Sequence, residues 1–136
     1  MKKPALLIFI KNPVKGRVKT RLAKSIGDEQ ALHIYHQLLK KTREVALRVD
    51  AGRFLFYADT ITEQDEWPQA YYNKLLQKQV NDLGERMKAA FDNVWAKGYA
   101  KAIIIGSDCP ALEEEHLQKA LEKLNEHDAV IGPAND

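Results

Sequence analysis

A basic segment near the start of the chain has the residue types of a phosphate-binding loop. Residues 11–21 hold five cations within eleven positions: Lys11, Lys15, Arg17, Lys19 and Arg21. Gly16 lies in the middle of them, and a glycine lets backbone N–H groups approach an anion closely. Arginine adds a planar pair of donors that matches phosphate oxygens. We predict that this loop binds the phosphates of a nucleotide, with a solvated basic loop as the alternative.

The loop departs from the phosphate-binding pattern of P-loop kinases and ATPases. That pattern needs two glycines, the second of them directly followed by lysine. The segment Gly16-Arg-Val-Lys19-Thr20 lacks the first glycine and has two residues between Gly16 and Lys19. The sequence therefore argues against a P-loop kinase or ATPase.

Two aspartates that follow later apolar segments are candidate metal ligands. Asp108 ends the run Ile103-Ile-Ile-Gly-Ser-Asp108, and Asp136 ends Gly132-Pro-Ala-Asn-Asp136. Mg²⁺ and Mn²⁺ bind through one or two carboxylates together with phosphate oxygens, so we predict a divalent metal at Asp108 and Asp136. The alternatives are that Asp108 caps a turn and that Asp136 belongs to a frayed chain end. Asp59 is a weaker candidate for contact with a base or ribose.

These candidates follow short apolar runs that are typical of buried strands. The runs are nearly unbroken, which is typical of strands in a parallel sheet covered on both faces: Ala5–Ile10, Arg53–Ala58, Ala102–Gly106 and Ala129–Gly132. Helical patterns separate them, the first capped by Asp28, the second by Asp82 and the third between Glu113 and Asn125. Residues 63–79 are ambiguous, with a short strand over Lys74–Val80 as one interpretation. Such alternation predicts an α/β protein that binds its ligand at the carboxyl ends of the strands.

Composition limits the class of protein. The length of 136 residues fits one domain, and the net charge of +2 gives no support for a partner such as nucleic acid or a membrane surface. Cys109 is the one cysteine, so an internal disulfide is excluded and a reducing compartment is expected. The run Ala5–Ile10 is shorter than the ~7–15 apolar residues of a signal peptide core, and no stretch reaches a membrane span. We expect a cytoplasmic protein.

Four spaced motifs together resemble one family. In chain order they are Phe9-x-Lys11-x-Pro13-x-x-Gly16-x-x-Lys19-Thr20-Arg21-Leu22, Asp82-Leu-Gly-Glu-Arg-Met87, Gly106-Ser-Asp108-Cys-Pro110 and Gly132-Pro-x-x-Asp136. The chain resembles small bacterial GT-A-type, glycosyltransferase-like proteins of the radical-SAM/selenodomain-associated transferase type. These are similar in fold to nucleotide-diphospho-sugar transferases and to cofactor nucleotidylyltransferases. The resemblance implies a three-layer α/β/α sandwich with a mostly parallel, Rossmann-like (GT-A) sheet.

The resemblance also assigns residues to a nucleotide site. It implies that the basic loop contacts the donor phosphates through Lys11, Gly16, Lys19 and Arg21. By position, Asp108 matches the metal-associated aspartate of the family. The motif that begins at Asp82 also belongs to the resemblance, but its residue types do not indicate one role. Arg86 is a candidate phosphate ligand, and the alternative is that Glu85 and Arg86 are an exposed pair on a helix.

The function implied is transfer from a nucleotide or nucleotide-sugar donor to an unknown small-molecule acceptor, by glycosyl or nucleotidyl transfer, with Mg²⁺ or Mn²⁺. The family usually continues past the last motif, so we expect residues 1–136 to form a single GT-A-like nucleotide-binding domain without the C-terminal acceptor-side elements. The alternative is a non-catalytic nucleotide-binding module or a truncated, inactive GT-A domain. An exposed sheet edge in such a domain favours a homodimer.

Overall fold

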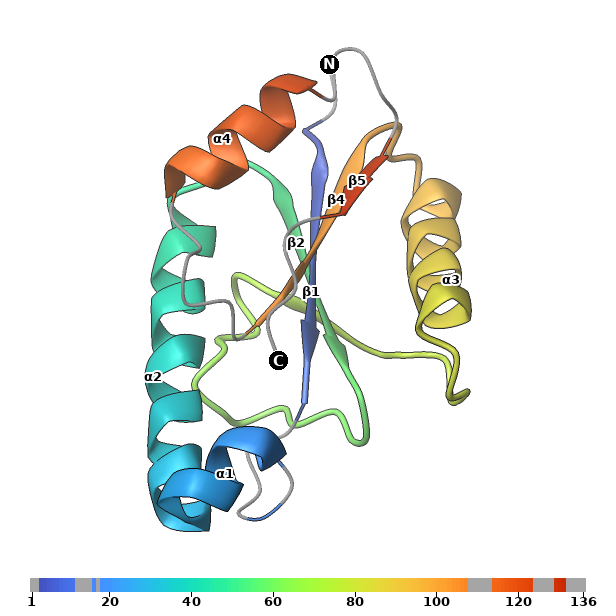
Figure 1. Cartoon of the computed structure of the whole chain (residues 1–136). Helices are drawn as coiled ribbons and strands as arrows, with labels where there is room; N and C mark the ends of the chain where they lie inside the picture. The colour runs from blue at the N-terminus through green and yellow to red at the C-terminus, as the bar shows by residue number, and fades with distance from the viewer. Residues whose placement is uncertain (1–2, 12–15, 17, 108–113, 124–128, 132–136) are drawn as a thin grey trace.

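The core of the molecule is a five-stranded sheet in the order β3-β2-β1-β4-β5 (Figure 1). A computed structural model describes residues 3–11, 16, 18–107, 114–123 and 129–131. Within these ranges the strands are β1 (Ala5–Ile10), β2 (Gly52–Tyr57), β3 (Asn73–Leu76), β4 (Ala102–Gly106) and β5 (Ala129–Ile131). All neighbouring pairs are parallel. The prediction of a parallel, Rossmann-like sheet is therefore confirmed.

Helices cover both faces of this sheet and make the three layers of the sandwich (Figure 1). They are α1 (Thr20–Ile26), α2 (Asp28–Leu47), α3 (Leu83–Ala96) and α4 (Glu114–Lys123). Helix α2 lies along one face and α3 along the other. The three-layer α/β/α sandwich that the family resemblance implied is confirmed.

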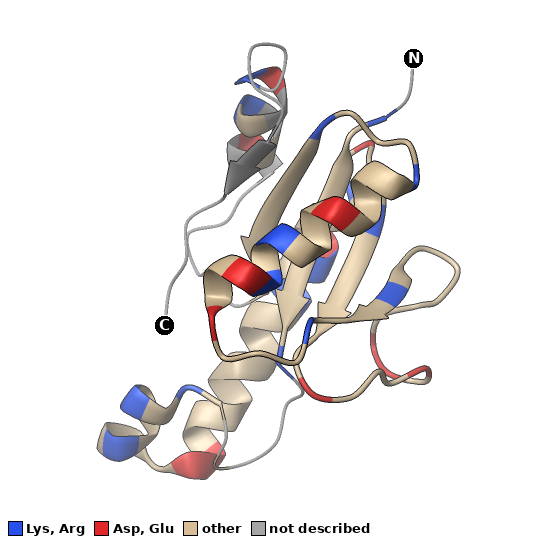
Figure 2. Cartoon of the chain, turned by 90° about the vertical axis from the view of Figure 1, so that its right-hand side faces the viewer, with Lys and Arg blue, Asp and Glu red and all other residues tan. Residues whose placement is uncertain are grey.

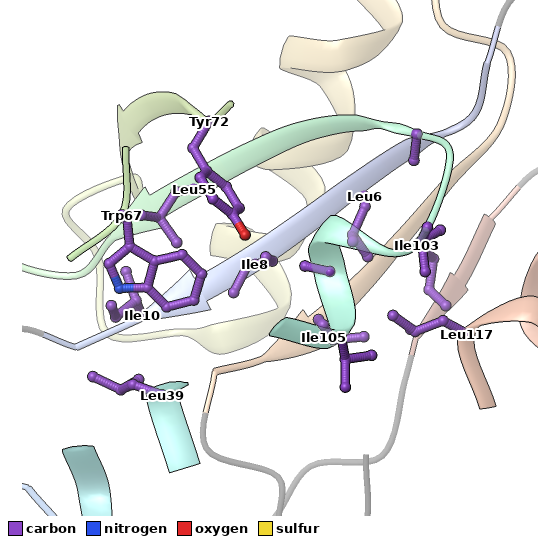
Figure 3. Close-up of a cluster of buried hydrophobic side chains, with 14 of the residues drawn as sticks. Leu6, Ile8, Ile10, Leu39, Leu55, Trp67, Tyr72, Ile103, Ile105 and Leu117 are labelled. Carbon is purple, nitrogen blue, oxygen red and sulfur yellow. The ribbon is translucent and has the colours of Figure 1, made fainter. Parts of the chain in front are cut away.

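Alternate side chains of β1 enter the two halves of the core. Leu6 and Ile8 point to the α2 side, where they join Leu39 of α2 and Leu117 of α4 (Figure 3). Leu7 points to the α3 side and belongs to a second buried cluster. Burial on both faces is the reason why β1 is apolar at nearly every position instead of at every second one.

The strand order reverses between β1 and β4. From β1 the chain continues to β2 and β3 on one side, and from β4 it continues to β5 on the other. In open α/β sheets the crevice at such a reversal, outside the carboxyl ends of the strands, is where ligands bind.

Three local elements differ from the sequence-based predictions. Helix α1 has no counterpart among the predicted elements. The N-cap of α2 is Gly27, with a φ of 92°, and the predicted cap Asp28 is the first residue of the helix. Strand β3 ends at Leu76, so residues 77–80 follow the strand instead of forming it. Asp82 does cap α3, because its Oδ1 accepts a hydrogen bond from the N–H of Gly84 at 3.1 Å.

The described helices include none with the length and apolar character needed to cross a membrane.

Candidate functional site

A pocket of ≈ 600 Å³ opens at the carboxyl ends of four neighbouring strands. Lys11 follows β1, Asp59 lies two residues after β2, Gln77 follows β3 and Ser107 follows β4. The remaining lining residues come from these strand ends, α1, α2 and α3: Phe9, Ile10, Val18, Lys19, Thr20, Tyr35, Ala58, Lys78, Gln79, Val80, Asn81, Leu83 and Arg86. The volume is in the usual range of small-molecule sites, ~300–1,000 Å³.

The charge of the pocket lining is mainly positive. Lys11, Lys19, Lys78 and Arg86 line it, and Asp59 is the one carboxylate among its described lining residues. A concave site with an excess of cations raises the local concentration of anions. The pocket is therefore chemically suited to a phosphate-bearing ligand.

The structure brings three of the five predicted nucleotide-binding residues to this pocket. Lys11 and Lys19 approach it from the loop after β1, and Arg86 approaches from α3. Arg21 is exposed on α1 and, like Gly16, is not among the described lining residues. Helix α1 lies at the end of the molecule toward which the strand arrows point, and Figure 2 shows basic residues (blue) on it.

The backbone of the basic loop takes left-handed conformations at two positions. Gly16 has a φ of 84°, which glycine adopts without steric cost. Lys19 has a φ of 49° although it carries a side chain. Such a conformation is sparsely populated in non-glycine residues and is enriched at ligand sites. Together with its charge, this conformation makes the turn a candidate for contact with a ligand.

The predicted metal ligands Asp108 and Asp136 lie outside the described residues. Ser107 is the last described residue before Asp108, and it lines the pocket. The described residues contain no group of three or more His, Cys, Asp or Glu side chains that would hold a metal by themselves. Asp59 is a carboxylate of the kind that Mg²⁺ uses together with phosphate oxygens.

Tyr35 of α2 fixes the end of β1. Its hydroxyl donates to the carbonyl of Lys11 at 2.6 Å and accepts from the N–H of Lys11 at 3.2 Å. The Tyr35 side chain is only 3% exposed, so this clamp is held inside the core. Lys11 is thereby positioned through its backbone, while its side chain lies at the pocket.

Thr42 of α2 fixes the end of β4 in the same way. Its hydroxyl lies 2.6 Å from the carbonyl oxygen of Ser107 and 3.0 Å from that of Leu38. The N–H of Ser107 donates to the carbonyl of Phe9 at 3.0 Å. Because Thr42 and Ser107 are both buried, the strand end next to Asp108 is tied to α2 and to β1.

A buried glutamine connects the ends of β2 and β3 to α3. The N–H of Gln77 donates to the carbonyl of Tyr57 at 2.8 Å, and its Nε2 donates to the carbonyl of Phe56 at 3.0 Å. Its Oε1 accepts a hydrogen bond from Nη1 of Arg86 at 3.0 Å. Arg86 is therefore held at the pocket by a neutral side chain.

The segment between β2 and β3 is anchored by Asp65. Its carboxylate accepts hydrogen bonds from Tyr57, from Lys74 at 2.7 Å and from the N–H of Trp67 at 2.9 Å. Burial of the Tyr57 hydroxyl, followed by its hydrogen bond to Asp65, raises the Tyr57 pKa far above its ordinary value. Tyr57 therefore stays neutral and acts as a donor that fixes this segment.

Sequence reasoning missed Tyr35, Gln77 and Lys78 as pocket residues. Tyr35 belongs to the apolar stripe of α2, so nothing in its spacing distinguishes it from a core tyrosine. Gln77 and Lys78 fell inside the strand interpretation of Lys74–Val80. The polar run from Gln77 to Gln79, directly after apolar residues, was the signal that the strand had ended.

Comparison with known proteins supports this interpretation of the fold. The chain is similar to a solved structure from Desulfovibrio desulfuricans G20 described as a "putative nucleotide-diphospho-sugar transferase", with a TM-score of 0.78 and 30% sequence identity. The similarity covers 92% of this chain and 55% of the other, so this chain spans about half the length of that relative. The curated proteins include no match to this chain. Residues 41–136, more than half of the chain, match the family described as "Uncharacterized protein conserved in bacteria (DUF2064)", and the chain belongs to this family.

Proposed function

We propose that this chain forms the donor-binding part of a transferase that uses a nucleotide or nucleotide sugar, by glycosyl or nucleotidyl transfer. The observation that carries the proposal is the basic pocket at the strand-order reversal. Lys11 and Lys19 on one side and Arg86 on the other surround a space at the carboxyl ends of the strands. The similarity to a structure described as a nucleotide-diphospho-sugar transferase supports the same ligand class.

A divalent cation, Mg²⁺ or Mn²⁺, is part of the proposal. Asp108 directly follows a residue that lines the pocket, and Asp59 lines it itself. A bound cation would supply charge neutralisation on the phosphates and on the leaving group. We assign Asp108, with Asp136, to hold the cation, and the lysines and Arg86 to bind phosphate oxygens directly.

Thermal stabilisation by ligands tests the proposal. Nucleoside diphosphates, nucleoside triphosphates and nucleotide sugars are each added with and without Mn²⁺, and the unfolding temperature is measured. A ligand present at 100 times its dissociation constant stabilises the folded state by about 2.7 kcal/mol. We expect one donor class to stabilise the protein, and more strongly with Mn²⁺. A folded protein that responds to none of these ligands would refute the proposal.

Two variants separate the metal from the nucleotide. In Asp108→Ala the Mn²⁺-dependent part of the stabilisation should disappear while the protein stays folded. The control is Asp92→Ala, because Asp92 is an exposed carboxylate on α3 that pairs with Lys88 at 3.2 Å and is not a lining residue. Equal Mn²⁺ dependence in both variants would assign Asp108 to turn capping.

The product identifies the type of transfer. Release of pyrophosphate from a nucleoside triphosphate would indicate nucleotidyl transfer, and release of a nucleoside diphosphate from a nucleotide sugar would indicate glycosyl transfer. Donor binding without either product would favour the non-catalytic nucleotide-binding module.

A further inference from the structure

Gln77 is a buried polar residue whose partners explain why a glutamine occupies this position. Its side chain meets an acceptor, the carbonyl of Phe56, on one side and a donor, Nη1 of Arg86, on the other. Only 4% of the residue is exposed, so water cannot replace either partner freely. The amide is a neutral group that donates with one atom and accepts with the other, and both neighbours favour the same orientation.

The neutrality of Gln77 matters for the charge of Arg86. Among the described residues, none of the ion pairs involves Arg86, although its side chain is half-buried and lines the pocket. Its Nε is buried and has no hydrogen-bond partner within the described part of the chain. The protein thus orients the guanidinium while leaving its positive charge, and part of its donor capacity, unused.

We propose that Gln77 is a positioning residue that holds the guanidinium of Arg86 as a receptor for a phosphate oxyanion in the pocket. An arginine held by a neutral amide keeps its full charge for a ligand, whereas one paired with a carboxylate does not. The inference rests on the proposed function in one respect, since it takes the oxyanion to be the diphosphate of the donor nucleotide. The receptor itself requires only an oxyanion.

Inorganic pyrophosphate is the probe, because its binding does not depend on the identity of the base or sugar. Its dissociation constant is measured by calorimetry for wild type, Gln77→Met, Arg86→Met and the double variant. Loss of a charged hydrogen-bond donor in Arg86→Met should weaken pyrophosphate binding about tenfold or more. Gln77→Met, which keeps the length of the side chain but neither hydrogen bond, should weaken it several-fold.

The double variant distinguishes positioning from a merely structural role. If Gln77 acts through Arg86, Gln77→Met should have no further effect once Arg86 is methionine. An equal loss from Gln77→Met in both backgrounds would overturn the inference. The matched control is Gln37→Met, since Gln37 is an exposed glutamine of α2 outside the pocket lining, and it should bind pyrophosphate as wild type does.

A variant that introduces a negative charge gives an independent readout. Gln77→Glu places a carboxylate next to Arg86 and should also weaken pyrophosphate binding. The affinity for the nucleoside of any nucleotide that binds should stay unchanged, because a nucleoside carries no phosphate. If Gln77→Met does not fold, Gln77→Glu takes its place, because unchanged pyrophosphate affinity in either Gln77→Glu or Arg86→Met overturns the inference. Pyrophosphate binding that depends on Arg86, with no binding of any nucleotide, would support the receptor and refute the proposed function. Nucleotide binding that is unchanged by substitution of Gln77 or Arg86 would support the proposed function and refute the receptor.

Discussion

Tyr35→Phe removes a single oxygen atom from the contact between α2 and the end of β1. The hydroxyl makes two hydrogen bonds to the backbone of Lys11, at 2.6 Å and 3.2 Å, and the ring is 3% exposed. Phenylalanine keeps the ring in the core, so packing is nearly unchanged. The variant therefore isolates the role of the clamp in stability and in the placement of Lys11.

The expected cost follows from the two lost bonds. A net ~0.5–1.5 kcal/mol is typical of each neutral hydrogen bond. Because Lys11 is exposed, water replaces part of what the hydroxyl supplied, so we expect the free energy of unfolding to fall by about 1–2 kcal/mol. For a domain of this size that corresponds to a melting temperature lower by roughly 4–8 °C. Stabilisation by pyrophosphate or nucleotide should also decrease, since Lys11 lines the pocket.

Urea unfolding and ligand-dependent thermal shifts measure the two effects separately. The matched control is Tyr72→Phe, because Tyr72 is equally buried and donates one long bond of 3.3 Å to the carbonyl of Arg43, outside the pocket lining. It should lose less stability and keep the full ligand response. The reasoning is refuted if Tyr35→Phe responds to ligands like the control or is as stable as wild type.

Three further predictions concern the fold, the first next to the pocket and the other two away from it. Thr42→Val leaves the buried carbonyl of Ser107 without its 2.6 Å donor, so urea unfolding should show a loss of ~1–3 kcal/mol, together with a smaller Mn²⁺-dependent thermal shift. Arg53→Met removes the guanidinium that donates to the carbonyls of Ala46 and Leu47 at the end of α2, at 2.8 and 3.2 Å, and to that of Val49 just after it, at 2.9 Å. This variant should cost ~2 kcal/mol in urea unfolding. Burial, opposed by nearby arginines, raises the pKa of Tyr72 to about 12, so stability should be intact below pH 10 and fall as the pH rises from 10 toward 12, measured by urea unfolding across this range.

Each of these has an outcome that would contradict it. Thr42→Ser keeps the hydroxyl and should retain the Mn²⁺ response, so an equal loss of that response in Thr42→Ser and Thr42→Val would dismiss the hydrogen bond as its cause. An Arg53→Met variant as stable as wild type in urea unfolding would contradict the role given to the guanidinium. Tyr72→Phe should make the decline of stability above pH 10 less steep, with Tyr57 contributing the remainder, and an unchanged slope would contradict the role given to Tyr72.

The sequence by itself determined four of the five described strands, two of them to the residue, and left β3 ambiguous. Strands β1 and β4 have the predicted bounds because continuous apolar runs, bounded by polar or charged residues, have few other ways to be buried. The start of α3 was predictable from Asp82, since an N-cap interaction is local. The basic loop could be recognised from charge and glycine content, and the family motifs indicated the superfamily that the structural similarity supports.

Tertiary structure decided which of these residues face one another. No local sequence pattern specifies the order of the strands. This order places the carboxyl ends of four strands around one pocket. The hydroxyl of Tyr35 reaches a backbone 24 positions away, and that of Thr42 reaches one 65 positions away. The guanidinium of Arg86 reaches Gln77 only because α3 packs beside β3, and no local pattern around either residue predicted that contact. Local propensity determines the helices and strands, whereas packing of the whole chain determines which side chains become hydrogen-bond partners. Hydrogen bonds between residues distant in sequence form only once the helices and strands have packed together.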